Sequence, residues 1–367
     1  MQGVSPYRFL EILNIVLFKI MKNNKKIYDV VIIGASISGL STATELLRRG
    51  IEPIIFERKS TIGFPVQCAE YIPAAFSLTT RKFIPAIAQK VDGLETHIIG
   101  YNGEFRQDYI GQKGYILNRN TFEQILAVDI LKNGGKLFLS EPVVDIEFGS
   151  SFANIETYRK KISANIVVGA DGPQSLVAMF AGVQSQKLIP AIQWVVPLKK
   201  RLDRNYILFH PEIVGGYGWL FPKGDIANLG IGAWGVSNKI LSIVAQYFSE
   251  FVVEQKVSIS GGLIPVYGMR ERICGKNFIL VGDSAGLADP ITGAGIANAF
   301  ESGRLAGETI ADFLNGNIEN LDIYSRKMKF LRSSLERSVN KRLDMEKNWK
   351  NEKEFIENIR RNWIHSR

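Results

Sequence analysis

Hydrophobic residues between positions 28 and 58 predict a strand, a helix and a second strand, in that order. Residues 29–33 are a short, β-branched apolar run, which is typical of a buried parallel strand. Apolar residues then recur at helical spacing, at Leu40, Ala43, Leu46 and Leu47. Gly50 ends this predicted helix, and the run EPIIFE predicts a second buried strand that ends at Glu57. We therefore expect a β-α-β unit here.

The buried-strand pattern returns twice further along the chain, at residues 164–170 and 277–281. Residues 115–134 have the pattern of a strand followed by a helix, with Asn120 or Thr121 as the predicted N-cap. Strands that alternate with helices in this way predict an α/β fold with a parallel sheet.

A different pattern begins near residue 186, where short alternating segments are separated by turns. The segments QWVVPL, NYILFH, GYGWLF, IANLGIGAW and VSISGGLIPVY predict an antiparallel sheet. The dipeptide Asn102-Gly103 predicts a hairpin turn inside an earlier insertion, residues 93–111. The two insertions are expected to form a smaller domain of their own.

One strand of this second sheet has an aromatic residue at every second position. Tyr217, Trp219 and Phe221 would share one face, and Gly218 and Leu220 the other. Two interpretations stay open for the aromatic face. It packs into an ordinary core, or it lines an apolar channel for a flat ring or a long apolar substrate.

The two ends of the chain differ from the rest in composition. Residues 9–21 are apolar but interrupted by charge, and they are shorter than the roughly 20 residues that span a bilayer. They form either a helix on a membrane surface or an extension before a natural start at Met21, which we favour. Residues 319–367 have a helical pattern, and from Ser325 on they carry 13 basic and 6 acidic residues. This basic segment is expected to pack on the protein body or to contact anionic lipid.

Composition excludes several classes of protein. A hydrophobic content of 46% and 34 glycines fit a folded globular chain of one large domain or two smaller ones. The formal net charge of +9 suits an acidic partner such as anionic lipid or a phosphorylated ligand, and no recognition motif supports nucleic-acid binding. Two cysteines and three histidines exclude a disulfide framework and a four-cysteine cluster, and they leave little for a metal site.

The turn after the first strand has the spacing of a dinucleotide-binding fingerprint. Gly34, Ser36 and Gly39 occupy its three glycine positions, and Glu57 lies about 20 residues further on. Backbone N–H groups and the helix N-terminus would face a pyrophosphate, and Glu57 would accept hydrogen bonds from a ribose. Ser36 departs from the pattern because its side chain occupies space where backbone approaches phosphate.

Two further turns follow buried strands, at Asp171-Gly172 and at Gly282-Asp283, and a glycine-rich loop then leads into a helix at Ile296. With these three motifs, residues 28–315 resemble the FAD-binding fold of the para-hydroxybenzoate hydroxylase superfamily. The resemblance implies that Asp283 meets the ribityl and phosphate part of FAD and that Arg119 contacts the FAD phosphates. The cofactor-binding residues predicted in this way are Gly34, Ser36, Ser38, Gly39, Glu57, Arg58, Cys68, Ala69, Arg119, Val143, Asp171, Gly172, Asp283, Gly293, Gly295 and Ile296.

Two local features point to one branch of this superfamily. The third motif reads GDSAG, without the histidine that the hydroxylases usually carry. The string PVQCAE at residues 65–70 and the strand YGWLFP at residues 217–222 resemble the geranylgeranyl reductase family. That resemblance implies a substrate site at Tyr217, Trp219, Phe221 and Pro222. Tyr71 stands where the family has glycine, which would narrow the pocket beside the flavin.

The resemblance implies an FAD-dependent reductase that saturates carbon–carbon double bonds of geranylgeranyl chains on membrane lipid precursors. Hydride would come from reduced flavin, and Cys68 is either the proton donor, a residue that shapes the flavin face, or a buried small side chain. Cys274 is expected to be structural, with a redox partnership to Cys68 left open. The alternatives are a flavin monooxygenase or epoxidase, a clusterless electron-transfer protein feeding quinone, and a flavin-free lipid-binding protein. The electron donor is NAD(P)H, ferredoxin or another reductant.

We predict an α/β fold with a Rossmann-type FAD-binding domain, an inserted antiparallel-sheet substrate domain and a C-terminal helical segment. The predicted boundaries are an extension at 1–27, an FAD-binding domain at 28–92, 112–185 and 262–318, a substrate domain at 93–111 and 186–261, and a basic helical segment at 319–367. The protein is expected to be a cytoplasmic monomer with peripheral contact to the inner face of the membrane.

Overall fold

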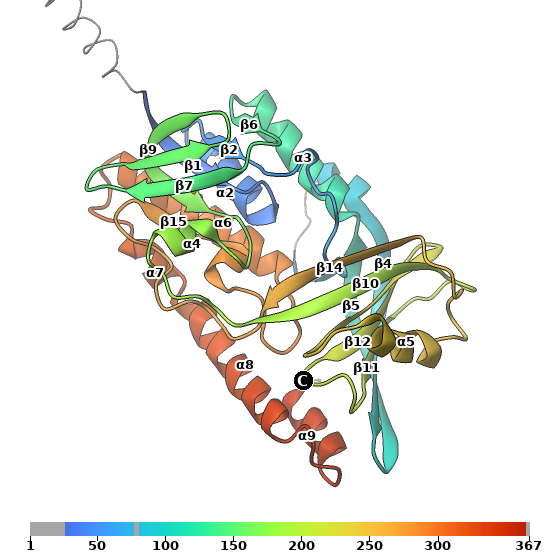
Figure 1. The fold of residues 1–367 in the computed structure, drawn as a ribbon. Coiled ribbons are helices and arrows are strands. Elements are labelled where there is room, and N and C mark those ends of the chain that lie inside the picture. The colour runs from blue at the N-terminus through green and yellow to red at the C-terminus, as the bar shows by residue number, and fades with distance from the viewer. Residues whose placement is uncertain (1–25, 77–80, 365–367) are drawn as a thin grey trace, which may run out of the picture.

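A computed structural model describes residues 26–76 and 81–364 of the chain, and these form two sheets joined by helices (Figure 1). The predicted extension at 1–27, with its surface-helix alternative and the proposed start at Met21, lies outside the described residues apart from its last two positions. The first strand already begins at Ile27.

The first sheet has the strand order β6-β2-β1-β9-β8-β7, and β15 pairs with the second half of β9. Its strands are β1 (Ile27–Ile33), β2 (Ile54–Phe56), β6 (Lys136–Phe138), β7 (Val143–Phe148), β8 (Ala153–Thr157), β9 (Lys161–Gly169) and β15 (Phe278–Leu280). Strands β6, β2, β1, β9 and β15 run parallel, whereas β7, β8 and β9 form an antiparallel meander. The central strand β1 is apolar because both of its faces are covered, as Val30, Val31 and Ile32 show by their complete burial.

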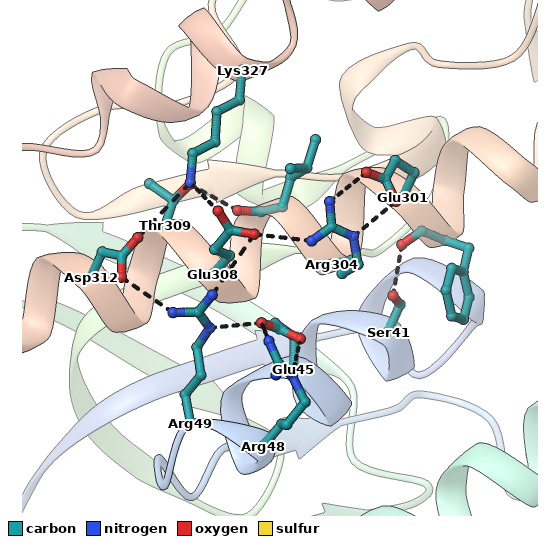
Figure 2. Close-up of polar contacts among 12 residues, drawn as sticks. Ser41, Glu45, Arg48, Arg49, Glu301, Arg304, Glu308, Thr309, Asp312 and Lys327 are labelled. Carbon is teal, nitrogen blue, oxygen red and sulfur yellow. Dashed lines mark hydrogen bonds and ion pairs between the residues drawn. The ribbon is translucent and has the colours of Figure 1, made fainter.

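Helices cover the first sheet and bring distant segments of the chain together. They are α2 (Ile37–Arg48), α3 (Arg119–Lys132), α4 (Leu176–Phe180), α6 (Ile296–Leu314) and α7 (Asp322–Lys327), with short 3₁₀ turns η1 (Arg81–Ala86) and η2 (Gly282–Ala285). Helices α2 and α6 approach so closely that a Cβ at Gly303 would overlap the carbonyl oxygen of Ser38. Figure 2 shows the charged edge of this pair, where Arg49 contacts Glu45, Glu308 and Asp312.

The second sheet has the order β14-β10-β13-β12-β11-β4-β5-β3, in which only β11 and β4 pair in parallel. Its strands are β3 (Tyr71–Pro73), β4 (Ile87–Gly100), β5 (Gly103–Leu117), β10 (Leu188–Pro197), β11 (Asn205–Phe209), β12 (Tyr217–Lys223), β13 (Ile226–Gly232) and β14 (Ser258–Pro265). The predicted Asn102-Gly103 hairpin connects β4 and β5. These two strands extend beyond the predicted insertion at 93–111, and the division of the chain into domains stays a prediction.

The two faces of β12 pack as its alternating sequence predicts. Leu220 faces the core under helix α5 (Asn238–Tyr247), and a Cβ at Gly218 would lie 2.5 Å from the side chain of Val244 in that helix. Trp219 and Phe221 belong to a separate cluster on the opposite face. The sheet therefore has two covered faces, with α5 on one of them.

The C-terminal helices α8 (Lys329–Lys347) and α9 (Phe355–Asn362) cover the aromatic face of the second sheet (Figure 1). The apolar stripe of this segment is buried there, at Trp349, Phe355, Ile359 and Trp363. The Trp363 ring meets Phe209 and Tyr217 edge to face, with centroids 5.0 and 5.2 Å apart. Of the two interpretations of the tail, packing on the protein body is confirmed for the stripe, so these rings are not available to a membrane.

Helix α3 begins earlier than the sequence predicts. Its N-cap is Asn118, so the predicted cap at Asn120 or Thr121 is wrong and Arg119 is the first helical residue. The reason is tertiary, because the backbone N–H of Arg119 donates to the carboxylate of Glu70 at 2.9 Å. The side chain of a residue 49 positions earlier thus binds the N-terminus of the helix, as a local N-cap side chain would. The predicted fold class, an α/β chain with a parallel sheet, an antiparallel sheet and C-terminal helices, is confirmed.

We expect Phe355→Ala to lower the free energy of unfolding by about 3–5 kcal/mol, because Phe355 is 1% exposed and the cavity cannot close. Phe330→Ala is the matched control: its ring is 84% exposed, so the same change should alter stability by about 0.5 kcal/mol or less. Urea titration of both variants measures the difference. Equal losses would show that α9 does not pack on the sheet as described.

Candidate functional site

The three turns predicted from the sequence lie against one another at the carboxyl ends of adjacent parallel strands. A Cβ at Gly34 in the first turn would overlap the carbonyl oxygen of Ala170, which precedes the second turn. A Cβ at Gly282 in the third turn would lie 2.8 Å from the hydroxyl oxygen of Ser38. The backbone N–H of Gly172 donates to the Ser284 hydroxyl at 3.0 Å. The turns after β1, β9 and β15 therefore form one continuous edge, where dinucleotides bind in sheets of this kind.

The first turn requires glycine for two different reasons. Gly34 has a φ of +101°, a conformation that disfavours any side chain, and a Cβ at Gly39 would overlap the carbonyl oxygen of Gly34. Glu57 stabilises this turn, because its carboxylate accepts the backbone N–H of Ala35 at 2.8 Å and that of Lys59 at 2.9 Å. Glu57 thus lies at the position expected for a ribose acceptor.

The segment around Val143 runs beside Glu57. The backbone N–H of Glu141 donates to the Glu57 carbonyl at 2.9 Å, and Val143 begins strand β7 two residues later. Arg58 is exposed at the same end of β2. Both residues lie close to Glu57 along the chain or across it, and their contacts with the adenine or any other part of a cofactor stay predictions.

Ser36, which replaces the middle glycine of the fingerprint, is bound by two charged side chains of helix α3. Its hydroxyl donates to Glu123 at 2.8 Å and accepts from the Arg119 guanidinium at 2.7 Å. Arg119 and Glu123 also form an ion pair at 2.5 Å. Burial opposes the charge of Arg119, but Glu123 raises its pKa above the ordinary value. Arg119 is therefore held at the first turn as a fixed cation, and its contact with the FAD phosphates stays a prediction.

Asp171 in the second turn is fully engaged by the protein itself. Its carboxylate accepts the hydroxyls of Ser175 at 2.6 Å and Ser284 at 3.1 Å, and also the backbone N–H groups of Leu176 and Val177 at the start of α4. Asp171 thus joins the second turn to the third. A direct contact of Asp171 or Gly172 with a cofactor stays a prediction.

Asp283 in the third turn has the opposite character. Among the described residues, none donates a hydrogen bond to its half-buried carboxylate. Burial raises the pKa of Asp283, and Arg119 opposes that shift. A Cβ at Gly295, the N-cap of α6, would lie 3.6 Å from the Asp283 carboxylate, so the absence of side chains at Gly293 and Gly295 leaves room at the N-terminus of α6 before Ile296. An acid that accepts no hydrogen bond from the described residues, beside a glycine-lined helix N-terminus, fits the ribityl and phosphate groups of FAD.

The predicted substrate residues lie next to this loop. The Tyr217 hydroxyl donates to the carbonyl of Thr292, and a Cβ at Gly293 would lie 3.9 Å from the same hydroxyl. The Trp219 indole N–H donates to the Gln193 amide oxygen at 3.1 Å. Pro222 pairs with Ala227 in the sheet interior. The aromatic strand thus adjoins the glycine-rich loop.

A small hollow lies beside Tyr217, lined by Phe209, Gly215, Gly216, Ile291, Arg342, Met345, Glu346 and Trp349. Phe221 meets the ring of Tyr71 edge to face at 5.9 Å, and Tyr71 lies over Gly114. These contacts bury Trp219 and Phe221 to more than nine tenths. They favour core packing for the two rings, and a channel along the aromatic face stays a prediction.

Cys68 and Ala69 lie between the aromatic strand and the first turn. Burial raises the pKa of the Cys68 thiol, and the Arg119 guanidinium nearby lowers it. The thiol sulfur accepts the backbone N–H of Glu70 at 3.2 Å. Cys274 is also a free thiol, but it lies in the core of the first sheet with its sulfur 3.1 Å from the Ser325 hydroxyl. Its surroundings fit the expected structural role.

The sequence analysis missed the polar residues that bind these predicted ones. Glu123 binds Ser36 and Arg119, and Glu70 accepts the backbone N–H of Arg119. Gln193 and Asn228 donate to the carbonyls of Cys68 and Ala69. Glu70 stands in the string PVQCAE, so the motif itself was the signal that could have identified it. Glu123 carries no local signal, because it occupies an ordinary helical position.

Within residues 26–76 and 81–364, no three His, Cys, Asp or Glu side chains gather as a metal site would require. The helices of this same part of the chain are all too short or too polar to cross a bilayer.

Known proteins resemble this chain in sequence. Residues 32–82 match the family described as an NAD(P)-binding Rossmann-like domain. The chain is 31% identical to a digeranylgeranylglycerophospholipid reductase from Methanothrix thermoacetophila in an alignment of 340 residues that covers 86% of this chain and 86% of that one.

Two solved structures share the fold. A geranylgeranyl bacteriochlorophyll reductase-like protein from Thermoplasma acidophilum superposes with a TM-score of 0.74 at 24% identity, over 89% of this chain and 87% of that one. A probable FAD-dependent monooxygenase from Pseudomonas aeruginosa superposes with a TM-score of 0.71 at 14% identity, over 91% of this chain and 99% of that one. At these identities the likeness concerns the fold.

We expect Asp283→Asn to weaken FAD binding and to raise the melting temperature of the flavin-free protein at neutral pH. The folded-state pKa of Asp283 lies above its ordinary value. The stability linked to its proton is therefore present below about pH 4 and is lost as the pH rises through the raised pKa. Asparagine removes that loss, so the melting temperatures of parent and variant should converge in acid.

Asp171→Asn is the control for the missing hydrogen bonds. Burial raises the pKa of Asp171 as well, but its carboxylate accepts four hydrogen bonds, so an amide there leaves donors unpaired. Its melting temperature should fall at neutral pH. FAD titration and thermal melts between pH 4 and 8 measure both variants. A fall in stability for Asp283→Asn would contradict the partnerless carboxylate described above.

Proposed function

The chain belongs to the family of digeranylgeranylglycerophospholipid reductases, which are FAD-dependent oxidoreductases, and on that premise we propose that it saturates double bonds of geranylgeranyl chains on a glycerophospholipid. One structural observation supports a particular site for this reaction. Three glycine-containing turns from distant parts of the chain meet at one edge beside the aromatic strand, and Arg119, which binds the first turn, lies near Cys68.

The described residues fit FAD along this edge. Glu57 would hold the ribose, Arg119 and the first turn would hold the phosphates, and Asp283 would hold the ribityl chain. When bound, the reduced flavin supplies the hydride. The donor that reduces the flavin is proposed to bind transiently, as NAD(P)H or as a ferredoxin.

The alkene of a prenyl chain is not polarised, so its reduction depends on positioning. Reacting atoms must be held within about 3–3.5 Å of each other. Tyr217 is bound to the carbonyl of Thr292 in the glycine-rich loop, so the aromatic strand and the loop that would contact the cofactor keep a fixed spacing. We assign the prenyl chain to this aromatic side, with Tyr217 at the reacting end.

Saturation of a double bond also requires a proton on the second carbon. Burial raises the pKa of Cys68, so the thiol keeps its proton at neutral pH. A protonated thiol beside the first turn suits the role of donor, in which the S–H bond breaks as the C–H bond forms. The resulting thiolate would be stabilised by Arg119, which already lowers the pKa of Cys68.

We expect the anaerobically reduced protein to be reoxidised when geranylgeranyl glycerophospholipid is added. The flavin absorbance should return at a rate that saturates with lipid, and the product should gain two hydrogen atoms for each flavin reoxidised. A fully saturated phytanyl lipid is the control, because it offers no alkene and should leave the flavin reduced. If the flavin is reoxidised only when air is admitted, and oxygenated lipid forms, a monooxygenase is favoured.

The same assay tests Cys68. Cys68→Ser keeps the size of the side chain but raises the pKa of the donor far above that of a thiol, so lipid-dependent reoxidation should slow by roughly 10²-fold or more. FAD content should stay unchanged. Reoxidation at the parent rate would remove Cys68 from the mechanism.

We also propose that the basic C-terminal segment contacts anionic lipid on the inner face of the membrane. Exposed lysines and arginines remain on α8, α9 and their connection after the apolar stripe is buried, at Arg337, Lys347, Lys350, Lys353, Arg360 and Arg361. Phe330 projects from the same segment with 84% of its surface exposed. Each basic residue near such a surface contributes about 1 kcal/mol.

We expect Lys350→Gln/Lys353→Gln to weaken binding to vesicles that contain anionic lipid by about 2 kcal/mol, roughly 30-fold. Lys132→Gln/Lys136→Gln is the matched control, because it removes the same charge from exposed positions on α3 and β6. Cosedimentation with anionic and zwitterionic vesicles measures the effect. Equal losses in both double variants would show that only net charge matters and would reject the tail as the contact.

A further inference from the structure

Glu70 holds an unusual backbone conformation in the middle of the predicted site. Its φ is +70°, in the left-handed region that disfavours side chains, and it is only 2% exposed. A non-glycine residue held in this region is strained and persists only where its surroundings fix it. The contacts of Glu70 explain what fixes it.

The carboxylate of Glu70 accepts hydrogen bonds from three different elements. It accepts the backbone N–H of Arg119 at the start of α3 at 2.9 Å, the Lys223 ammonium of β12 at 2.6 Å, and the Asn228 amide of β13 at 3.0 Å. The backbone N–H of Glu70 donates to the Cys68 sulfur at 3.2 Å. The side chain of Glu70 thus connects the first-sheet helix with two strands of the second sheet, and its backbone N–H binds the thiol.

A second row of hydrogen bonds holds the same segment from the aromatic side. The Asn228 amide also donates to the carbonyl of Ala69, and the Gln193 amide donates to the carbonyl of Cys68, both at 3.2 Å. Gln193 in turn accepts from the Trp219 indole at 3.1 Å. Gln193 and Asn228 are 6% and 1% exposed, so these amides of the second sheet bind the segment 68–70 and are largely inaccessible to water.

We propose that Glu70 and Lys223 form a positioning pair that fixes the Cys68 thiol and the start of α3, with Arg119, relative to the aromatic strand. Neither residue need touch substrate or cofactor. The proposal rests on the proposed function for its consequence, because a placed thiol matters only if Cys68 delivers the proton. The geometry itself does not depend on that function.

Because the pair is buried, each of its two charges depends on the other for compensation. The Lys223 side chain is 15% exposed and the Glu70 side chain 3%. Removing one partner of a buried pair leaves the other charge uncompensated. The negative charge of Glu70 acts on Cys68, and the positive charge of Lys223 offsets it. Loss of Glu70 should therefore make the electrostatic potential at Cys68 more positive, and loss of Lys223 should make it more negative.

Other charged and titratable groups around the thiol set the background for this effect. Arg119 and Glu70 face Cys68 directly, and Tyr217 lies on the aromatic side. Glu123 and Asp283 face Arg119. The variants below leave the side chains of these groups unchanged, so only the charges of the pair are altered by substitution.

The test is the titration of Cys68 in the FAD-bound protein, in a Cys274→Ser background that leaves one thiol within the chain. The rate of alkylation by iodoacetamide is measured against pH for the parent, Glu70→Gln, Lys223→Met and the double variant. Glu70→Gln should lower the thiol pKa, because a negative charge is lost beside it. Lys223→Met should raise it, and the double variant should return toward the parent.

A purely structural role predicts a different result. Loosening of the segment would speed alkylation in both single variants without moving the two pKa values apart. Shifts of the same sign, or no shift, would therefore overturn the proposal. Glu156→Gln and Lys161→Met are the matched control, because this exposed pair at 2.8 Å lies at the far end of the first sheet and should leave Cys68 unchanged. Lys223→Gln replaces Lys223→Met if the latter does not fold.

The second measurement separates this proposal from the proposed function. In lipid-dependent flavin reoxidation, Glu70→Gln should lower kcat by roughly 10- to 100-fold with little change in KM, because a displaced thiol affects the reacting atoms and not lipid binding. If the parent itself does not react with lipid, the proposed function fails while the thiol titration still decides the pair. An equal loss through KM would contradict positioning.

Discussion

The structure depends on the contact between backbone atoms where the first and second turns meet. Gly34 lies against the carbonyl of Ala170 with no room for a Cβ, and the third turn is held to the second through Ser284 and Asp171. This contact brings strands β1, β9 and β15 to one edge although they are far apart in sequence. Because the three turns share one edge, a single extended ligand can be held by all of them.

Charge is distributed unevenly around this edge. The Asp171 carboxylate accepts hydrogen bonds only from the protein, whereas Asp283 is half-buried and accepts none from the described residues. An acid held in this way reduces the stability of the empty fold, which is the usual compromise between stability and binding at functional sites. Arg119 offsets part of that cost from helix α3, and Glu70 fixes where the helix begins.

The C-terminal segment shows how one stretch of chain can serve two purposes. Its apolar stripe completes the core of the second sheet, where Trp363 contacts Phe209 and Tyr217. Arg337, Lys347, Lys350, Lys353, Arg360 and Arg361 remain exposed because the stripe points inward, whereas Arg342 is buried. Helix α8 also binds the loop before α6, since Ser338 donates to Asp289 at 2.8 Å and Arg342 to the carbonyl of Pro290 at 2.9 Å. The tail is therefore tied to both the aromatic strand and the glycine-rich loop.

The sequence by itself determined the elements whose signals are local: the β-α-β unit, the glycine turns, the Asn102-Gly103 hairpin and the two faces of the aromatic strand. These follow from spacing and backbone conformation, which neighbouring residues set. Only the tertiary structure decided that Asp171 serves the protein while Asp283 stays without a donor among the described residues, and that α3 begins at Arg119 because Glu70 accepts its N–H. Such outcomes depend on which groups meet across the fold. Hydrogen bonds between residues far apart in sequence leave no periodic trace in the chain, so a pattern cannot reveal them.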